Sequence, residues 1–391
     1  MSYTDQEKHK KMRKLVVISV VTIVVIIIGY LIGVLIPRII AWTTPAPVPP
    51  SCNFTVIYTG TGVTPSTNIY SGIMISVDGR DGFIALDAGS IFAGVRAFVE
   101  NNNLLTEDVA SSNTKIEFNF PDSMKSETER IGMILQNQLI GYFLGTIDLS
   151  HVLGLVMHSP QDVFNNETVR DASNLPTKKS IIGSTSTITG MQNVFDSPLW
   201  SMEPDNYLFT PIIPDVVHQV NDLLHFNDGT FYAKYFNQIK VKSYQTCQGD
   251  NFGTAYLFDR NGAQLLYLSA SGGNTFNKSC NWRENMNNIW SDQFLQPLNL
   301  TALFVEVSSV NATTFGHMTP YDLIGTLKDL MTIRSLSSIT SLDVYVQPVR
   351  EEYASVDSAA ADITSVLTFM STVSGVDATF NFQNQGDLLC T

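Results

Sequence analysis

The sequence predicts an α/β protein in which one β-sheet packs on another and helices cover the outside, preceded by a single transmembrane helix. Two observations predict it. Strand-like and helix-like segments alternate in two halves of the chain after Cys52, and a long apolar run near the N-terminus carries no charge. The predicted parts are a basic leader (1–14), a transmembrane helix (15–36), a Pro-rich stalk (37–51) and one large domain (52–391).

The apolar run spans residues 15–36, which are 22 residues without a charged side chain. A helix of this length reaches about 33 Å, enough to cross a hydrocarbon core of about 30 Å. The run is longer than the apolar part of a secretory signal peptide, and no small-residue cleavage site follows it closely. It is therefore predicted to be a signal-anchor that binds the lipid bilayer.

Charge on either side of this run predicts its orientation. Five Lys or Arg side chains precede it, and only Arg38 follows it closely. The positive-inside rule then keeps the N-terminus in the cytosol and makes this a single-pass type II protein. The large domain is expected on the extracellular or lumenal side. An anchor in the mitochondrial inner membrane, with the domain in the intermembrane space, would obey the same rule.

Two features flank the predicted anchor. Gly29 and Gly33 form a small-xxx-small pair that would let two helices approach closely, in a homodimer or a larger membrane assembly, although glycine is also common in membrane helices generally. The segment TTPAPVPPS (43–51) is rich in proline and is expected to act as a semi-rigid spacer.

Charge also restricts the partners of the large domain. The whole chain has a net charge of −13, with 23 basic and 36 acidic residues. Six of these basic and two of these acidic residues precede Cys52, so residues 52–391 carry 17 basic and 34 acidic side chains, a net charge of −17. Such a surface repels phosphate backbones, so no nucleic-acid partner is expected.

All four cysteines follow the predicted anchor, where an oxidising compartment favours two disulfides. Cys52 opens the domain and Cys390 closes it, so we predict that these two pair and that Cys247 pairs with Cys280; the alternative is four buried free thiols. Five N-x-S/T sequons permit a glycoprotein without arguing for one, because chance yields a similar number in this composition: Asn53, Asn166, Asn277, Asn299 and Asn311.

The order of the predicted elements supports the layered fold. Strand patterns are followed by helical ones, and the helix expected at 126–138 opens with a Ser-x-x-Glu cap signature. An Asp-Arg-Asn-Gly turn at 259–262 joins two apolar runs as a hairpin. The expected strands are 54–61, 71–78, 83–90, 139–147, 179–184, 239–247, 254–270, 300–309 and 342–350, and the expected helices are 91–100, 126–138, 151–158, 320–331 and 358–370.

Six stretches in a fixed order resemble the class II cyclic-nucleotide phosphodiesterases, a branch of the metallo-β-lactamase fold. Together they extend over most of residues 52–380. The resemblance implies an αββα sandwich with the active site at one edge, between the two sheets. The stretches are IYTGTGVTPSTN (57–68), FIALDAGSIFAGVRAFVE (83–100), HVLGLVMHSPQD (151–162), KSIIGSTSTI (179–188), the hairpin 255–268 and FGHMTP (315–320).

The resemblance also exposes a departure in the metal-binding motif. Members of the family carry His-x-His-x-Asp-His after the fourth strand, where these side chains hold two zinc-type ions that activate a water and polarise the phosphate. Here the stretch reads Thr146-Ile-Asp148-Leu-Ser150-His151, and only His151 matches. Asp148 is still able to coordinate a metal, Ser150 coordinates poorly and Thr146 hardly at all.

The other ligand positions implied by the family are also changed. A family histidine corresponds to the region of Thr246 and Cys247, the bridging aspartate corresponds to Ala270, and the last histidine corresponds to Pro348. Alanine and proline side chains cannot bind a metal. His317 in GHMTP matches the family histidine beside the phosphate. Asp87 in LDAGS matches the residue that holds the turn beneath the site.

The histidine inventory supports this without reference to the family. The large domain has five histidines, at 151, 158, 218, 225 and 317, and none forms His-x-His. We therefore expect no metal cofactor and no catalytic residue, with His151, His317 and Asp148 as remnants.

Structural roles compete with functional ones for these histidines. His151 is expected to satisfy a loop carbonyl and His317 to cap a helix or make a buried hydrogen bond. His218 and His225, on one predicted helical face with Asp222 between them, make either a polar face or a replacement metal site.

Three functions remain open at this stage. The leading hypothesis is a membrane-anchored pseudoenzyme that binds a small ligand or a partner through its former active-site cleft; the ligand is unknown. The second is an active 3',5'-cyclic-nucleotide phosphodiesterase outside the cytosol, using His151, Asp148 and His317 with a divalent metal such as zinc. The third is an accessory subunit of a larger membrane complex. The usual serine-hydrolase, zincin, thioredoxin and Walker motifs are absent from the sequence.

Overall fold

The computed structural model divides the chain into two units, residues 1–51 and 52–391. The predicted leader, membrane helix with Gly29 and Gly33, and stalk all lie outside the described residues. No helix among the described residues is long and apolar enough to cross a membrane. The described residues are 52–60, 71–77, 82–102, 104, 126–157, 179–195, 207–224, 236, 238–248, 251–272, 280–308, 317–349 and 356–391.

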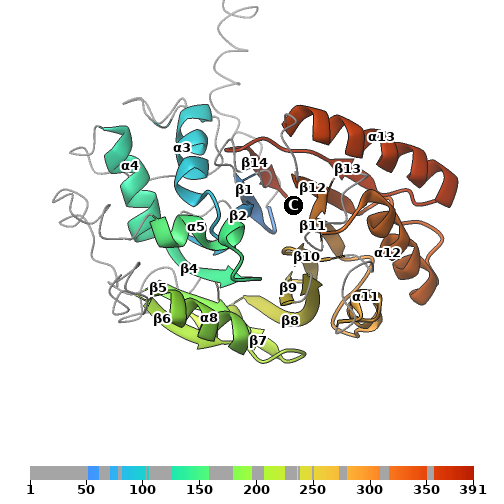
Figure 1. Cartoon of the computed structure of the whole chain (residues 1–391), viewed down its shortest axis with the longest axis horizontal. Coiled ribbons are helices and arrows are strands. Elements are labelled where there is room, and N and C mark those ends of the chain that lie inside the picture. Colours follow the sequence, from blue (N-terminus) through green and yellow to red (C-terminus); the bar gives the residue numbers. More distant parts are fainter. Residues whose placement is uncertain are drawn as a thin grey trace, which may run out of the picture. The chain divides into compact units, whose positions relative to one another are not determined.

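Two seven-stranded sheets form the centre of the second unit (Figure 1). In the first sheet the spatial order is β14 (Leu388–Cys390), β1 (Thr55–Gly60), β2 (Gly72–Ser76), β3 (Phe83–Leu86), β4 (Leu139–Leu144), β5 (Lys179–Gly183) and β6 (Tyr207–Pro211). In the second it is β13 (Thr379–Asn381), β12 (Asp343–Val349), β11 (Leu300–Ser308), β10 (Ala263–Leu268), β9 (Asn251–Arg260), β8 (Ile239–Gln248) and β7 (Val217–Gln219).

Each sheet is half parallel and half antiparallel. Strands β3 to β6 are parallel in the first sheet, and β10 to β13 are parallel in the second. The remaining neighbours in both sheets run antiparallel. In parallel strands the carboxyl ends lie at one edge of the sheet, and loops that follow them gather there.

Helices cover the outer face of each sheet, and three apolar cores separate the layers. One core lies between the sheets and contains Phe143, Tyr256 and Phe304. A second lies under the helices of the first sheet, and a third, around Trp290, under those of the second. The αββα layers predicted from sequence are therefore confirmed (Figure 1). The helices are α3 (Ile91–Asn101), α4 (Glu127–Met133), η3 (Ile134–Gln138), α5 (Leu149–Met157), α8 (Thr185–Phe195), α9 (Val220–Leu223), α11 (Trp282–Ser291), α12 (Pro320–Ile333) and α13 (Val356–Ser374).

Local sequence signals account for several boundaries. Ser126 caps α4 in a capping box with Glu129, as the Ser-x-x-Glu signature predicts. The helix predicted to continue to residue 138 widens into the π-helical turn η3 from Ile134, and β4 begins directly after it at Leu139. Asn261 and Gly262 both have positive φ in the predicted hairpin turn.

The prediction that His218 and His225 share a helical face with Asp222 is wrong. His218 lies in strand β7, and the helix that follows it, α9, has only four residues. The short strand pairs with β8 through His218 and Val241, so sheet pairing overrides the helical spacing of the sequence. His225 and His158 lie outside the described residues.

Two disulfides join the predicted pairs. Cys52 is bonded to Cys390, which ties the start of the domain to β14, and Cys247 is bonded to Cys280, which ties β8 to the start of α11. Of the five sequons, Asn53 and Asn299 lie in the described part of the chain, where Asn299 is exposed before β11. Asn166, Asn277 and Asn311 lie outside it.

Lys179 gives the fold a testable pH dependence. Lys179 is the first residue of β5, and its buried side-chain nitrogen donates to the carbonyl of Leu139 at the start of β4. Burial lowers its pKa from the usual 10.5 to about 7. Between these two values the unfolded chain binds a proton that the folded chain releases, so stability rises with pH across this window.

Between pH 7.5 and 9.5 we expect the free energy of unfolding to rise more steeply with pH in the wild type than in Lys179→Met. The difference between the two slopes is expected to reach about 1.4 kcal/mol per pH unit. Urea unfolding of both proteins at several pH values measures the difference, and other titrating groups cancel in the comparison. Parallel pH profiles would contradict the assignment of a depressed pKa to Lys179.

Candidate functional site

The loops that follow the parallel strands bring the predicted site residues to one edge of the two sheets. Asp87 directly follows β3, and the stretch from Thr146 to His151 follows β4. From the second sheet, Ala270 follows β10, Glu306 lies near the end of β11, and Pro348 lies near the end of β12. This is the edge between the sheets where the family resemblance places an active site.

Asp87 is fully buried and joins both sheets through its carboxylate. One oxygen accepts the backbone N–H of Gly145 at 2.8 Å. The other accepts the hydroxyls of Tyr267 at 2.8 Å and Ser269 at 2.6 Å and lies 2.9 Å from His151 Nδ1. Asp87 has a φ of 58°, a left-handed conformation that costs about 1–3 kcal/mol and that these bonds hold in place. It supports the turn beneath the site, as the resemblance implies.

His151, on α5, lies between two carboxylates from other elements. Its Nδ1 faces Asp87, and its Nε2 lies 3.5 Å from Glu306 Oε1. Burial by itself would lower the pKa of the imidazole, but the charges of Glu306, Asp87 and Asp148 outweigh this effect and raise the pKa to about 9. The ring is therefore protonated at neutral pH. Its Nδ1 is within hydrogen-bond distance of Asp87, whereas Nε2 faces Glu306 without a hydrogen-bond partner in the described part of the chain.

Glu306 connects His151 to His317. The second oxygen of this fully buried carboxylate lies 3.6 Å from His317 Nδ1. Among the described residues, neither oxygen of Glu306 has a hydrogen-bond partner within range. His317 is held there because the next residue, Met318, pairs with Val307 and accepts the N–H of Ser308. Of the two roles predicted for His317, a helix cap or a buried hydrogen bond, the cap belongs instead to Thr319, in a capping box with Asp322.

A hydrogen-bonded bridge occupies the positions that correspond to the first two family ligands. Thr146 Oγ1 donates to Gln248 Oε1 at 2.8 Å, and Gln248 Nε2 donates to Asp148 Oδ2 at 3.0 Å. Gln248 ends β8 in the second sheet, so this bridge, which we call the Thr146–Gln248–Asp148 bridge, links the β4 loop to the opposite sheet. The side chains of Thr146 and Asp148, which would need to turn toward an ion, are each hydrogen-bonded to Gln248 instead.

The ligand positions in the second sheet do not offer metal-binding groups. Ala270 is fully buried, Pro348 carries only carbons, Thr246 is buried, and Cys247 is consumed by its disulfide with Cys280. In the described part of the chain, no three His, Cys, Asp or Glu side chains are arranged to hold a metal ion. The residues present do not fit the two-metal centre that the family resemblance implies.

Sequence analysis missed Glu306, Gln248, Tyr267 and Ser269. A signal existed for Glu306, because it is the single charged residue in the otherwise uncharged strand 300–308. The sequence carried no comparable signal for Gln248, because its partners Thr146 and Asp148 lie about a hundred residues away along the chain. Only the packing of the two sheets brings them together.

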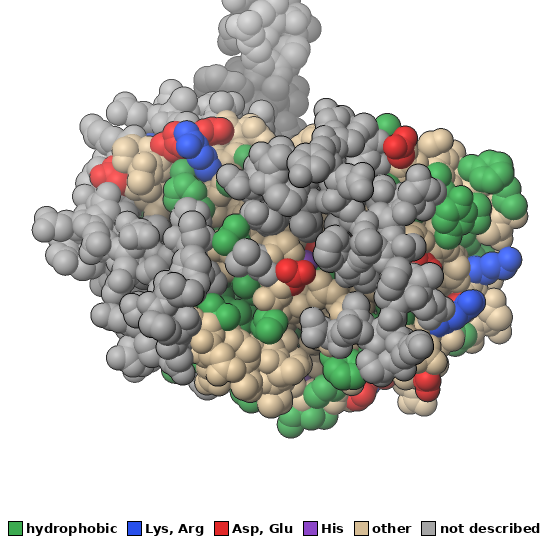
Figure 2. Space-filling model, viewed as in Figure 1, with side chains coloured by type: hydrophobic (Ala, Val, Ile, Leu, Met, Phe, Trp, Pro, Cys, Tyr) green, Lys and Arg blue, Asp and Glu red, His purple; other side chains and the backbone are tan. Residues whose placement is uncertain are grey.

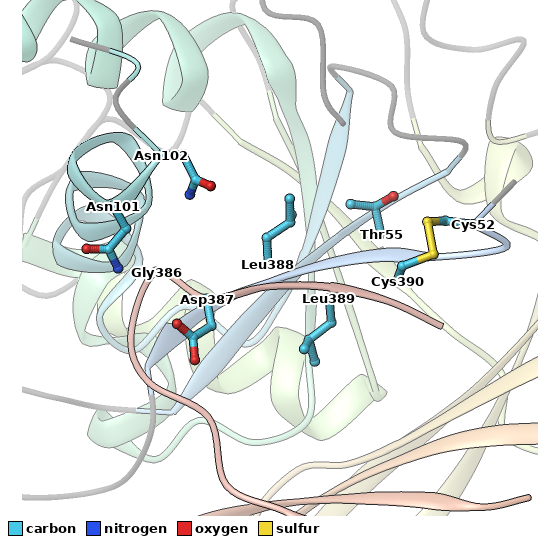
Figure 3. A pocket seen from close by; sticks show the side chains of 9 residues that line it. All are labelled: Cys52, Thr55, Asn101, Asn102, Gly386, Asp387, Leu388, Leu389 and Cys390. Carbon is cyan, nitrogen blue, oxygen red and sulfur yellow. A yellow bond between two sulfur atoms is a disulfide. The ribbon is translucent and has the colours of Figure 1, made fainter. Parts of the chain in front are cut away.

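Two cavities lie near the described surface. One, of about 390 Å³, lies between α3 and β14 beside the Cys52–Cys390 disulfide and shares no residue with the strand-end site. Figure 3 shows Leu388 and Leu389 in its wall pointing to opposite sides of the strand. The other, of about 310 Å³, includes Gly253 and Thr254, and the Thr254 N–H donates to the Gly145 carbonyl. This second cavity therefore adjoins the strand-end site.

The cavity beside the strand-end site has an uncharged wall whose exposed surface is more apolar than polar. Tyr244 and Phe252 contribute aromatic rings, and Phe252 is 48% exposed. No charged side chain lines the cavity, and the polar side chains in its wall are those of Ser184, Thr185, Ser186, Ser243, Tyr244, Gln245 and Thr254.

The central role of the Asp87 carboxylate is testable. In Asp87→Asn one oxygen becomes an amide N–H₂ facing hydroxyl and imidazole donors, and the His151 ring loses the nearest of its counter-charges. Breaking such a buried pair costs about 3–5 kcal/mol, so we expect a loss of this size in the free energy of unfolding, measured by urea denaturation. The control is Asp362→Asn on the exposed side of α13, expected within about 0.5 kcal/mol of wild type. Equal stabilities of the two variants would contradict this role.

Comparisons with known proteins agree with the fold. The 3',5'-cAMP/cGMP phosphodiesterase A of Dictyostelium discoideum, named as cAMP/cGMP-dependent, is 23% identical over 360 residues, covering 82% of this chain and 77% of that protein. The 3',5'-cyclic-nucleotide phosphodiesterase of Aliivibrio fischeri is 24% identical over 335 residues, covering 82% and 87%. The crystal structure of unliganded yeast PDE1 superposes with a TM-score of 0.65 at 17% identity, covering 87% of this chain and all of that one.

A family model described as cAMP phosphodiesterases class-II matches residues 55–386, which is most of the described domain. This match agrees with the ordered stretches, with the αββα layers and with the strand-end position of Asp87, His151 and His317. The chain belongs to the class II cAMP phosphodiesterase family.

Proposed function

We propose that the protein is a membrane-anchored, phosphodiesterase-like protein that no longer hydrolyses cyclic nucleotides and acts by binding or assembly. The observation that carries this proposal is the Thr146–Gln248–Asp148 bridge, in which the side chains at two ligand positions are hydrogen-bonded within the domain. Ala270 and Pro348 remove two more ligands. Loss of several ligands from one site abolishes the water activation that a two-metal centre supplies.

The fold does not need the ions for its stability. Each sheet packs on the other and on its own helices through extended apolar cores, which supply the main driving force for folding. Side-chain hydrogen bonds within the domain and the contacts of His151 with two carboxylates hold the strand-end loops. A domain of this kind retains a shaped surface after catalysis is lost.

A binding role is supported by the cavity beside the strand-end site. Its volume of about 310 Å³ suits a small molecule, and its uncharged wall, which is more apolar than polar and carries several hydroxyl groups and one amide, favours an uncharged ligand. The domain is proposed to face the extracellular or lumenal side, because its two disulfides persist in an oxidising compartment and the basic leader favours a cytosolic N-terminus.

A second candidate is an active cyclic-nucleotide phosphodiesterase acting outside the cytosol. Two observations favour it: relatives over most of the chain are named as such enzymes, and His151, Glu306 and His317 form one buried polar group. In this case His151, Asp148 and His317 would be the catalytic and metal-binding residues, with a divalent metal such as zinc.

Metal content and turnover separate the two functions. The full chain, purified in mild detergent, is analysed for bound metals and assayed for cyclic AMP hydrolysis with added zinc or manganese. We expect no stoichiometric metal and no turnover above buffer, because the ligand positions are bonded elsewhere or apolar. His317→Ala serves as the control, with thermal melting to verify its fold; the proposal predicts that its readings equal those of the wild type.

The opposite result would overturn the proposal. One or two equivalents of metal, together with turnover that falls in His317→Ala, would establish the phosphodiesterase. Isolation of the same preparation as a stable complex with other proteins would instead favour an accessory subunit of a larger membrane assembly.

A further inference from the structure

The two disulfides of the domain differ in their access to solvent. Cys390 is exposed at the end of β14, whereas its partner Cys52 is only 6% exposed. Both residues line the cavity of about 390 Å³ between α3 and β14. Figure 3 shows the bond between their sulfur atoms at one end of this wall, beside Thr55. A small molecule in the cavity is therefore able to reach this disulfide from the side of Cys390.

The other disulfide is enclosed by the domain. Cys247 is 1% exposed and Cys280 is 6% exposed. The side-chain amide of Asn285 donates to both sulfur atoms, at 3.3 Å and 3.4 Å. Neither cysteine lines one of the two cavities described above. Because exposed disulfides exchange with thiols more readily than enclosed ones, the domain contains one labile and one protected bond.

The two sulfur atoms of the accessible disulfide are suited to different roles. In thiol–disulfide exchange a thiolate attacks one sulfur, and the other sulfur leaves as a thiolate. The exposed Cys390 is the one open to attack, so the buried Cys52 is the leaving group. The guanidinium group of Arg260 donates to the carbonyl of Cys52 at 3.2 Å and to that of Asn53 at 2.8 Å. A positive charge beside a thiol lowers its pKa, and a thiol of lower pKa leaves faster.

The charge around the cavity selects among thiols. Residues 52–391 carry a net charge of −17, and the single charged side chain among the described residues that line the cavity is the carboxylate of Asp387. Lys and Arg side chains are also sparse among the described residues on the face that Figure 2 shows. These surroundings repel a reagent that carries a carboxylate, sulfonate or phosphate group.

We propose that the Cys52–Cys390 disulfide is a reversible modification site for a small thiol without a negatively charged group. The thiol loses its proton, its sulfur bonds to Cys390, and the bond between Cys52 and Cys390 breaks. Cys52 keeps the electron pair of that bond and takes up a proton. One disulfide is consumed and one is formed, so the step needs no separate oxidant or reductant.

The exchange would open a covalent link between the two ends of the domain. The two cysteines are separated by 338 positions in the sequence, and a cross-link over so long a loop stabilises a fold by restricting the unfolded chain. Backbone hydrogen bonds between Phe54 and Thr391, at 3.1 Å and 2.9 Å, still hold β14 beside β1. We therefore expect the modified domain to remain folded and to melt at a lower temperature. The inference is independent of the metal content of the strand-end site and of the proposed loss of hydrolysis.

Mapping of the modified cysteines tests the site. The full chain in mild detergent is treated briefly with 2-mercaptoethanol in the absence of denaturant, free thiols are blocked with N-ethylmaleimide, and the peptides are identified by mass spectrometry. We expect the mercaptoethanol adduct on Cys390 and the maleimide on Cys52, with the Cys247–Cys280 disulfide intact. The same treatment in urea serves as the positive control, in which both disulfides react.

Two comparisons of initial rates test the chemistry of the site. At low ionic strength 2-mercaptoethanesulfonate is expected to react more slowly per thiolate than 2-mercaptoethanol, because its sulfonate is repelled. Arg260→Gln is expected to slow the exchange, and the charge-retaining Arg260→Lys to keep a rate closer to that of the wild type. A purely structural role of Arg260 would have the opposite effect, since a loosened domain exposes its disulfides and reacts faster. Melting temperatures verify the fold of both variants, and the adduct map of the wild type does not depend on them.

Several results would overturn the proposal. Adducts on Cys247 or Cys280 that form as fast as the one on Cys390 would show that exchange requires unfolding. A first adduct on Cys52, or no adduct at all without urea, would show that Cys390 is not open to attack. Equal rates per thiolate for the two thiols would remove the selection by charge. An unchanged or faster exchange in Arg260→Gln would remove the role of Arg260.

Discussion

At the edge where the two sheets meet, the Asp87 carboxylate accepts hydrogen bonds from both of them. The N–H of Gly145 belongs to the loop after β4 in the first sheet, and Tyr267 and Ser269 belong to β10 and its end in the second. Gly145 is required here, because a side chain at this position would place its Cβ 2.1 Å from that of Ser269. The same carboxylate orients His151, so the geometry of the site depends on this one buried charge.

The buried charges around Asp87 are balanced within the protein. A protonated His151 stands between the carboxylates of Asp87 and Glu306, and burial of such a group is tolerable only with opposite charges on both sides. In the β4 loop that leads to His151, the Thr146–Gln248–Asp148 bridge joins this loop to β8. Contacts between side chains thus hold these loops together.

Membership of the class II cAMP phosphodiesterase family and an altered metal site are compatible, because fold and chemistry rest on different residues. The apolar cores between and outside the sheets need no ligand, whereas water activation needs several correctly placed ligands at once.

The layered fold follows from local patterns, which is why the sequence alone predicted it, whereas the changed ligand positions are implied by the resemblance to the family. Apolar periodicity identifies each strand and helix, capping signatures identify helix starts such as Ser126, and the residue types at Thr146, Ala270 and Pro348 exclude strong ligands whatever the geometry. Cys52 and Cys390 close the domain at its two ends, and this position alone indicated their pairing.

Only the tertiary structure decided which distant side chains meet. Gln248 reaches Thr146 and Asp148 across about a hundred residues, and Glu306 faces His151 and His317, because two sheets place the ends of their parallel strands at one edge. It also placed His218 in a strand, since pairing of β7 with β8 outweighs a helical spacing. Sequence patterns report each residue's local preference, whereas contacts between sheets depend on register and packing, which no short segment contains.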